Sequence, residues 1–489
     1  MIDLEHLEQY RENNRIEAKK ALGGLPHSIW ETYSAFANTL GGILLLGVEE
    51  YKDKSLHPVD LPDPEKLVKE FWDMVNNPNK ASVNLLSTKD VTVETVNGKR
   101  IIVIHVPRAD RTYKPVYVEG NPLNTYRRNG EGDYKCTSEE LHAMYRDASI
   151  QTQDMKILKE MDLGVFNADC LRAYRQRMRI SRPGHVWDML EDEDFLLKMG
   201  AVGIGEDGKK HPTAAGLLMF GNEYDIVREY PQYFLDFREE YDDTHRWTDR
   251  FVSSSGDWSG NVFDFFFRAY NKIQLDLKVP FEMDGPFRVD DTPVHQAVRE
   301  ALANCLVNAD YYGRGGLVVI KRRNEITLTN PGNFRIDIAA AKAGGLSDPR
   351  NGTMLKLFNM IDIGERAGSG IPNIFRVWHD QGWQEPKITQ SFSPDRITLA
   401  LAFISTDDKK VLIKSADKKD DKKAQIKSAV QKEQIIAYLT DHPRAAASEL
   451  CELLGVKPTR VRNLLREMIA EEIVVAEGGN RNRTYRLKA

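Results

Sequence analysis

The most restrictive feature of the sequence is a stretch near its C-terminal end, residues 407–427, in which lysine and aspartate dominate. It contains the run KKDDKK and has no apolar periodicity. A segment of this composition cannot bury enough apolar surface to offset the entropy lost when it becomes ordered. A single core therefore cannot run through it. We predict a charged linker at residues 407–430 and a separate folded block at residues 431–489.

The rest of the composition is that of a globular chain. Hydrophobic residues make up 41% and charged residues 29% of the 489 residues, and this length predicts about three domains. The four cysteines lie far apart without CxxC spacing, which argues against a zinc site and suits a reducing cytoplasm. We expect a cytoplasmic protein without a membrane span, because the apolar run 41–48 is too short to cross a bilayer. The net charge of −5 means that any nucleic-acid binding has to come from local patches.

Three further blocks precede the linker. Residues 1–150 alternate helix-like and strand-like patterns, with a buried strand predicted at 43–48 and a hairpin around Asn97-Gly98. Residues 151–290 form a connecting region in which no motif indicates a chemical role. Residues 291–406 predict a helix at 292–309, two strands within 317–328, a helix from 371 and a strand at 396–404. We therefore predict an α/β multidomain protein.

The helix predicted in VREALANCLVNADYYGRGG, residues 298–316, carries polar side chains at a regular spacing. Glu300, Asn304 and Asn308 recur every four residues, so they line one face. The amide oxygen of Asn304 is a ligand type that Mg²⁺ prefers. Glu300 could orient and deprotonate a water that attacks a γ-phosphate. The alternative is that this face is simply solvated.

Two glycine segments follow this helix. Asn330-Pro331-Gly332 ends a predicted strand, and the segment from Gly364 to Gly370 precedes a predicted helix. Glycines at a helix N-terminus allow backbone N–H groups to approach a phosphate, which the helix dipole also favours. Either segment alone is weak evidence, and the ordered set with strands between is more specific. The predicted nucleotide-binding residues are Asn304, Asn308, Asn330, Gly332, Gly364, Gly368, Ser369 and Gly370.

Residues 290–404 resemble the RecG-like subfamily of the GHKL (Bergerat-fold) ATPases. The resemblance is carried by HQAVREALANCLVNADYYGRGGLVVI, ITLTNPGNF and ERAGSGIPNIF. It implies an α/β sandwich that binds ATP with Mg²⁺ or Mn²⁺. By position it makes Glu300 the catalytic base and Asn304 the metal ligand, and it places Gly368 and Gly370 in the second glycine box. Where the superfamily has an adenine-reading aspartate, this chain has Asn330-Pro331-Gly332.

An acidic cluster near the N-terminus is the second candidate site. Glu17 and Lys19 are two residues apart, so on a strand they would point to one face. Glu12 precedes them, and Glu49-Glu50 follows the buried strand. Carboxylates that hold a divalent metal beside a lysine are a general arrangement for cleaving phosphodiesters. The alternative is a set of ordinary surface charges.

Residues 8–145 resemble the Schlafen core, also called the Schlafen-like AlbA domain. The resemblance is carried by ENNRIEAKK, YSAFANTLGGILLLGVEE and YKPVYVEGNPLNTYRRNGEGDYKCTSEEL. It implies an α+β core, and some members cleave RNA with three acidic residues. Glu12 and Glu17 match the first two, and Glu50 best matches the third. These three residues are the expected metal ligands and, with Lys19, the expected catalytic set. Lys114, Arg127 and Arg128 would contact nucleic acid, or else they belong to a solvated loop.

The last block, residues 431–489, looks like a winged helix-turn-helix. Leu454-Gly455-Val456 forms the predicted turn, and a helix from 458 to 470 follows it. Such a helix could enter a major groove of DNA. The alternative is a winged helix that contacts protein. The predicted nucleic-acid-binding residues here are Lys457, Arg460, Arg462 and Arg466.

Two functions of different class fit these features, and the joint presence of Glu12, Glu17, Lys19 and Glu50 favours the first. The first is a Schlafen-like metal-dependent endonuclease, acting on RNA or DNA under the control of a nucleotide site and serving bacterial defence. The second is an ATP-responsive transcriptional regulator that binds DNA at two places and cleaves nothing. We expect a homo-oligomer in either case, because both resembled families often dimerise.

Overall fold

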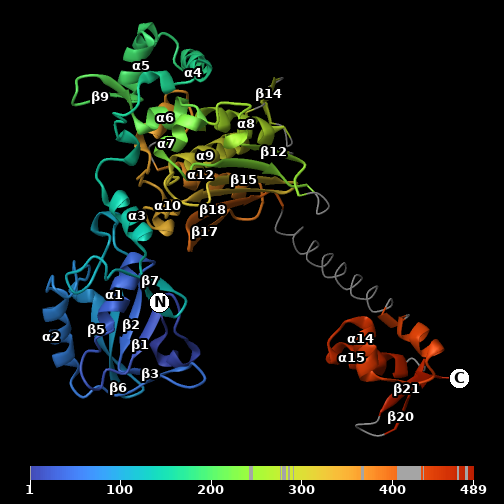
Figure 1. The fold of residues 1–489 in the computed structure, drawn as a ribbon. Helices are drawn as coiled ribbons and strands as arrows, with labels where there is room; N and C mark the ends of the chain where they lie inside the picture. The colour runs from blue at the N-terminus through green and yellow to red at the C-terminus, as the bar shows by residue number, and fades with distance from the viewer. Residues whose placement is uncertain are drawn as a thin grey trace. The chain divides into compact units, whose positions relative to one another are not determined.

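The computed structural model describes residues 2–241, 246–275, 277, 282–284, 287–289, 291–364, 368–404, 431–432, 434–470, 473–478 and 483–488. The chain divides into two compact units, Met1–Phe403 and Ile404–Ala489 (Figure 1). The linker predicted at 407–430 lies outside the described residues. Together these units form a mixed α/β multidomain protein with several sheets, as predicted. Within the described ranges, no helix combines the length and apolar character needed to cross a membrane.

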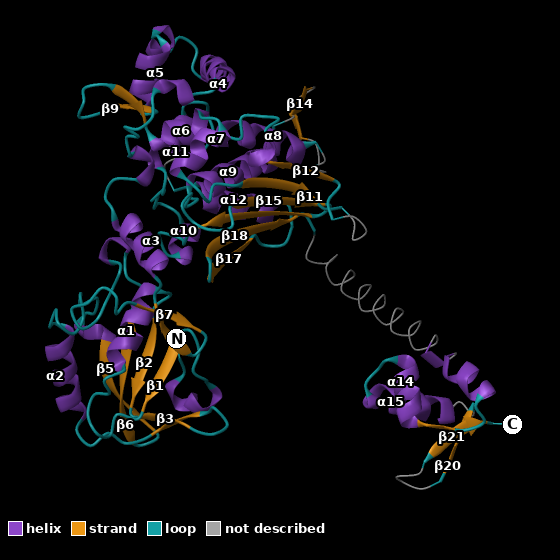
Figure 2. Cartoon of the chain, in the orientation of Figure 1, coloured by secondary structure: helices purple, strands orange, loops and turns teal. Residues whose placement is uncertain are grey.

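The first unit begins with a four-stranded sheet in the order β1-β2-β6-β5 (Figure 2). Strands β1 (Ile16–Lys19) and β2 (Gly42–Leu46) are parallel, and β6 (Lys99–Val106) pairs antiparallel with β2 and with β5 (Val91–Val96). Leu44 and Leu46 join one core, with α1 (Ile29–Asn38) and α2 (Pro64–Val75), and Leu45 joins a second core on the opposite face. Burial of both faces explains why β2 is a continuous apolar run.

Smaller elements complete this part of the unit. Two short hairpins pair β3 (Val48–Glu50) with β4 (Leu56–Pro58) and β7 (Tyr126–Asn129) with β8 (Gly132–Lys135). Helix α3 (Ser138–Ala148) begins with a capping box in which Thr137 and Glu140 each accept a hydrogen bond from the other residue's backbone N–H.

A six-stranded sheet in the order β12-β11-β15-β16-β18-β17 organises the rest of the first unit. Strand β11 runs parallel to β15, and all the other neighbours are antiparallel. Strands β11 and β12 come from the block 151–290, so the sheet draws on two of the predicted blocks. The strands are β11 (Leu235–Glu239), β12 (Asp249–Val252), β15 (Leu317–Arg322), β16 (Glu325–Pro331), β17 (Lys387–Phe392) and β18 (Asp395–Ala402).

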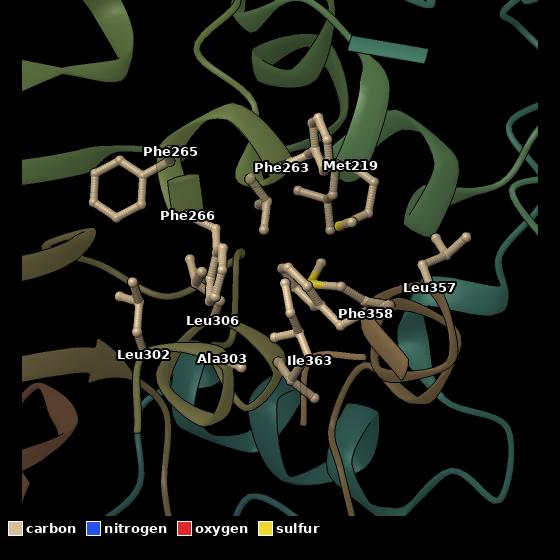
Figure 3. Packing of buried hydrophobic residues seen from close by; sticks show 14 of the residues in the cluster. Met219, Phe263, Phe265, Phe266, Leu302, Ala303, Leu306, Leu357, Phe358 and Ile363 are labelled. Carbon is tan, nitrogen blue, oxygen red and sulfur yellow. The ribbon is translucent and has the colours of Figure 1, made fainter. Parts of the chain in front are cut away.

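Helices cover one face of this sheet and share its largest core (Figure 3). Phe266 of α8, Leu302 and Leu306 of α9, and Phe358 of α11 are fully buried there. Each such side chain contributes about 1.5–3 kcal/mol by leaving water. Helix α9 packs against β16 and against three other helices. The four helices are α8 (Val262–Gln274), α9 (Pro293–Val307), α11 (Gly352–Asn359) and α12 (Gly370–Asp380).

The remaining elements include α6 (Ala214–Phe220), which is buried in this core along its whole length. The others are α4 (Ala168–Ser181), α5 (Asp192–Met199), α7 (Glu223–Glu229), α10 (Ile338–Ala343), and the hairpins of β9 (Val202–Ile204) with β10 (Lys210–Pro212) and β13 (Glu282–Asp284) with β14 (Phe287–Val289).

The second unit is the predicted winged helix-turn-helix. Residues 434–441 are helical, followed by α14 (Ala447–Leu454) and α15 (Pro458–Ala470). Gly455 ends α14 in the left-handed conformation, with φ 59°, where glycine carries no strain. Leu450, Leu464 and Met468 fill its core. The strands β19 (Ala445–Ala446), β20 (Val474–Glu477) and β21 (Thr484–Leu487) form a three-stranded sheet.

Candidate functional site

A cavity of about 140 Å³ lies where α9, α12 and the six-stranded sheet meet. Its apolar wall includes Leu328 of β16 and Ile397 of β18. Its polar lining includes the predicted residues Glu300, Asn304, Asn308, Asn330, Gly368 and Gly370. The helix periodicity therefore places Glu300, Asn304 and Asn308 along one cavity wall, while the opposite face of α9 is buried in the core.

The second glycine segment packs directly on the Glu300–Asn304 pair. Asn304 donates from Nδ2 to Oε1 of Glu300 at 3.0 Å. A Cβ atom added to Gly370 would lie 2.2 Å from Glu300 Oε1 and 3.0 Å from Asn304 Nδ2. Only a residue without a side chain allows this approach. Residues 365–367 of the predicted segment lie outside the described part of the chain.

The first glycine segment contacts a residue that sequence reasoning missed. Gly332 has φ 102°, and a Cβ there would lie 2.2 Å from Nη1 of Arg350. Arg350 donates to the carbonyl oxygen of Asn308 at 2.6 Å, and through Nε and Nη2 to both oxygens of Asp147 in α3 at 2.9 and 2.8 Å. Burial alone would lower the pKa of Arg350, but Asp147 outweighs it and raises the pKa above its ordinary value.

Two further predicted residues lie on the same wall. Asn330 is buried and donates from Nδ2 to the carbonyl oxygen of Pro331 at 3.1 Å. Gly368 has φ 68°, and its Cα faces the backbone of Leu346. Ser369 lies immediately before α12. Gly364 lies in the loop near Glu300. The other residues shape the cavity through their backbone, because none of them carries a charged side chain.

In the acidic cluster, Glu17 is fully engaged by cations. Glu17 is only 4% exposed. Its Oε1 lies 2.5 Å from Nζ of Lys19, and its Oε2 lies 2.6 Å from Nη2 of Arg128. Arg128 also pairs with Asp133 at 3.0 Å. The guanidinium of Arg128 therefore lies where a divalent cation bound to Glu17 would have to compete with it.

The other carboxylates of this cluster have different partners. Glu12 accepts a hydrogen bond from the backbone N–H of Ala18 at 3.0 Å. Burial raises the pKa of Glu12, and the charges of Glu17 and Glu50 add to this effect. Glu50 pairs with Lys54 at 3.3 Å, and Glu49 with Lys20 at 2.9 Å. Among the described residues no three His, Cys, Asp or Glu side chains are placed to hold a metal ion. The expected metal site of Glu12, Glu17 and Glu50 therefore stays a prediction, and it would require Glu17 to exchange a cationic partner for the metal.

Of the basic residues predicted to contact nucleic acid in this domain, Arg127 and Arg128 are buried and Lys114 is half-buried. Arg127 is 6% exposed and pairs with Glu140 at 2.9 Å and Asp395 at 2.8 Å. Arg128 is 2% exposed and holds Glu17 and Asp133. Lys114 donates to the carbonyl oxygen of Asn38 at 2.8 Å. The sequence could not reveal Asp395, Glu17 and Asn38 as partners, because they are distant along the chain from the residues that they contact.

The winged helix presents its predicted basic residues more openly. Lys457, Arg462 and Arg466 are exposed. Arg460 is half-buried, and its Nε donates to Oε1 of Gln431 at 3.2 Å. Three of the four predicted cations are therefore available to a ligand of α15.

Family comparisons agree with this architecture. Residues 12–137 match the family described as Schlafen, AlbA_2, and residues 142–236 match a domain of unknown function. Residues 319–399 match the family described as "Putative ATP-dependent DNA helicase recG C-terminal". Residues 431–475 match winged helix-turn-helix DNA-binding domains. No curated protein matches the chain.

Two solved structures are similar to parts or all of the chain. The DIP2311 protein from Corynebacterium diphtheriae is 16% identical over 97% of this chain and 95% of its own, with a TM-score of 0.40. The N-terminal domain of a RecG-related protein from Nitrosomonas europaea is 36% identical over 27% of this chain and 90% of its own, with a TM-score of 0.22.

The matched families carry coarse functional implications. The ATPase-type domain implies ATP binding, and the winged helix implies DNA binding. The chain therefore combines a Schlafen AlbA_2 domain, a RecG-like C-terminal ATPase-type domain and a winged helix-turn-helix.

Proposed function

We propose that this protein is an ATP-responsive DNA-binding regulator. In this proposal the cavity beside α9 takes ATP, and α15 of the winged helix contacts duplex DNA. The observation that carries the proposal is the packing of Gly370 against Glu300 and Asn304, which brings a helix N-terminus and a carboxylate–amide pair to one cavity. Backbone N–H groups at such a terminus suit phosphate, as the arrangement of a GHKL-type α/β sandwich would require.

The residues of the cavity also fit the Mg²⁺ that accompanies ATP. Asn304 uses its Nδ2 for Glu300, so its amide oxygen is the atom suited to a hard cation. A bound Mg²⁺ would supply charge neutralisation for the phosphates. Glu300 is placed beside Asn304 to orient and deprotonate a water, and Ile374, Ile397 and Leu399 provide an apolar surface for a base.

Calorimetry of ATP binding with Mg²⁺ tests this proposal. Asn304→Ala is expected to weaken binding at least tenfold, because it removes a cation ligand. Glu300→Ala is expected to preserve binding and to abolish any hydrolysis, because a base acts mainly in the transition state. Asn324→Ala is the matched control, since Asn324 lies in the exposed turn between β15 and β16. Absence of ATP, ADP and GTP binding by the unmodified protein would contradict the proposal.

A metal-dependent nuclease is the second candidate function. It is favoured by the position of Glu12, whose carboxylate is influenced by the charges of Glu17, Glu50 and Lys19. It requires Arg128 to leave Glu17, because both oxygens of Glu17 are engaged. The regulator needs no such rearrangement, and we therefore favour it.

A cleavage assay separates the two functions. The protein is incubated with transfer RNA and with single- and double-stranded DNA, in the presence of Mg²⁺ or Mn²⁺ and with or without ATP. Glu17→Gln keeps the shape of the side chain and removes its charge. We expect no cleavage by either protein. Cleavage that requires the metal and disappears in Glu17→Gln would establish the nuclease instead, whereas equal cleavage by both would indicate a contaminant.

A further inference from the structure

A second and larger cavity lies within the first unit, between the Schlafen-like part and the six-stranded sheet. Its volume is about 440 Å³, which is in the range of small-molecule sites. Asn333, Phe334 and Arg335 line both this cavity and the candidate nucleotide cavity. Its cationic lining consists of Arg108, Arg111, Lys114, Arg127, Arg146, Arg314 and Arg335. Its acidic lining consists of Glu139, Glu140, Asp147, Asp310 and Asp395.

The carboxylates of this cavity are already neutralised by arginines. Arg127 pairs with Glu140 and Asp395, Arg146 with Asp310 at 3.1 Å, and Arg314 with Glu139 at 2.7 Å. Asp147 is held by Arg350. Counting also Arg350 and Asp348, which pair with residues of the lining, the cations outnumber the carboxylates by eight to six.

Two cations have no carboxylate partner. Within the described ranges, neither Arg108 nor Lys114 lies within ion-pair distance of an acidic side chain. Lys114 donates to the carbonyl oxygen of Asn38, and Arg108 donates to the carbonyl oxygens of Phe334 and Ile336. Uncompensated buried charge is unfavourable, so the cavity retains an excess of positive charge that its own side chains do not balance.

Three arginines of the lining have an unused hydrogen-bond donor. The Nε atoms of Arg127, Arg146 and Arg335 are buried and make no hydrogen bond among the described residues, although Nε of Arg335 lies 3.5 Å from Oδ2 of Asp348. All three arginines line this cavity. A native structure rarely leaves buried donors unsatisfied without a water or ligand to accept from them. Water can accept single bonds but cannot balance the two extra cations, whereas an oxyanion can do both.

We propose that this cavity binds a small phosphate-bearing molecule. Its oxygens would accept from the guanidinium and ammonium groups that line the cavity, and its negative charge would compensate Arg108 and Lys114. The volume of about 440 Å³ suits a small ligand. This site is separate from the one proposed for ATP, since neither Glu300, Asn304 nor Gly370 lines it.

The electrostatics of Lys114 agree with this assignment. Burial, with the neighbouring charges of Arg108 and Arg127, lowers the pKa of Lys114 well below its ordinary value, and Asp147 and Asp395 offset this only in part. Burial also lowers the pKa of Arg335 to about 10. Both groups would hold their protons more tightly beside an anion.

Calorimetry on the full chain tests the proposal, with inorganic phosphate, pyrophosphate and adenosine monophosphate as ligands. The chain carries Asn304→Ala, which weakens the site proposed for ATP. We expect at least one of these anions to bind and to raise the Tm. Lys114→Met removes the charge and preserves most of the side-chain length. It is expected to weaken binding at least tenfold, while the Tm without ligand stays equal or rises. Lys69→Met, at an exposed position of α2, is the control and should bind as before.

If Lys114→Met fails to fold, Arg108→Gln carries the same test and the same expected loss of affinity. Unchanged affinity in the folded variant would overturn the proposal. Absence of binding by all three anions would overturn it as well. Binding of single-stranded DNA without binding of any small phosphate, lost in Lys114→Met, would replace it with a nucleic-acid contact.

Discussion

Glu12 and Glu17 lie five residues apart, and their charges have opposite energetic consequences. Burial raises the pKa of Glu12, whose carboxylate also faces the charges of Glu17, Glu50 and Lys19. The folded state therefore holds this proton more tightly than the unfolded state does. The resulting stability is present below the unfolded pKa of about 4.5 and is lost as the pH rises through the higher folded pKa.

We predict that Glu12→Gln leaves the free energy of unfolding unchanged or raises it at pH 7. The amide oxygen can still accept from Ala18, and the unfavourable charge is gone. The advantage should shrink as the pH falls toward 4.5. Urea unfolding of both proteins between pH 4.5 and pH 7 measures this difference. A clear loss of stability at pH 7 would show that the charge of Glu12 has a partner that we have not identified.

We predict the opposite for Glu17→Gln, which should lower the free energy of unfolding by about 3 kcal/mol, because it leaves the buried Arg128 with one carboxylate instead of two. Glu49→Gln is the matched control. Its pair with Lys20 is exposed and should contribute less than about 1 kcal/mol. The same urea titration at pH 7 checks both variants, and equal losses would contradict the difference in burial on which the prediction rests.

At the scale of elements, the contact between the glycine loop and α9 can be tested without unfolding the protein. Gly370→Ala places a Cβ against the flexible end of Glu300, so we expect a stability change below about 1 kcal/mol and at least a tenfold loss of ATP affinity. Gly368→Ala is expected to cost more stability, about 1–3 kcal/mol, because φ is 68° and the backbone of Leu346 is in the way. Thermal unfolding and calorimetry distinguish the two. Unimpaired ATP binding in Gly370→Ala would place the nucleotide elsewhere.

Helix α15 supplies the second prediction at this scale. The double charge reversal Arg462→Glu with Arg466→Glu should lower affinity for duplex DNA and flatten its dependence on salt, because fewer counterions are released. Lys69→Glu, on α2 of the other unit, should bind DNA normally. Binding measured by fluorescence anisotropy from 50 to 300 mM salt gives both quantities. If deletion of residues 431–489 leaves DNA affinity unchanged, the winged helix is a protein-contact module.

For the whole molecule, the sequence predicted what depends on local patterns. The four-residue spacing of Glu300, Asn304 and Asn308 was enough to predict that they line one cavity wall. Asn330, Gly368 and Gly370 line the same cavity, whereas Gly332 lines the second one. The sequence could not predict that Arg128 would hold Glu17, because 111 residues separate them. Nor could it identify Arg350, whose partner Asp147 lies 203 residues away. Long-range pairs leave no periodic signal, and they decide whether a carboxylate can bind metal.

The segment from Asn333 to Arg335, which forms a wall common to both cavities, has a thermodynamic consequence. If a ligand on one side shifts this wall, it changes the affinity of the ligand on the other side. Because free energy around a closed binding cycle sums to zero, the two ligands must alter each other's dissociation constants by the same factor. A cell could then change the nucleotide occupancy of this protein through the concentration of a second metabolite, with the ATP concentration held constant.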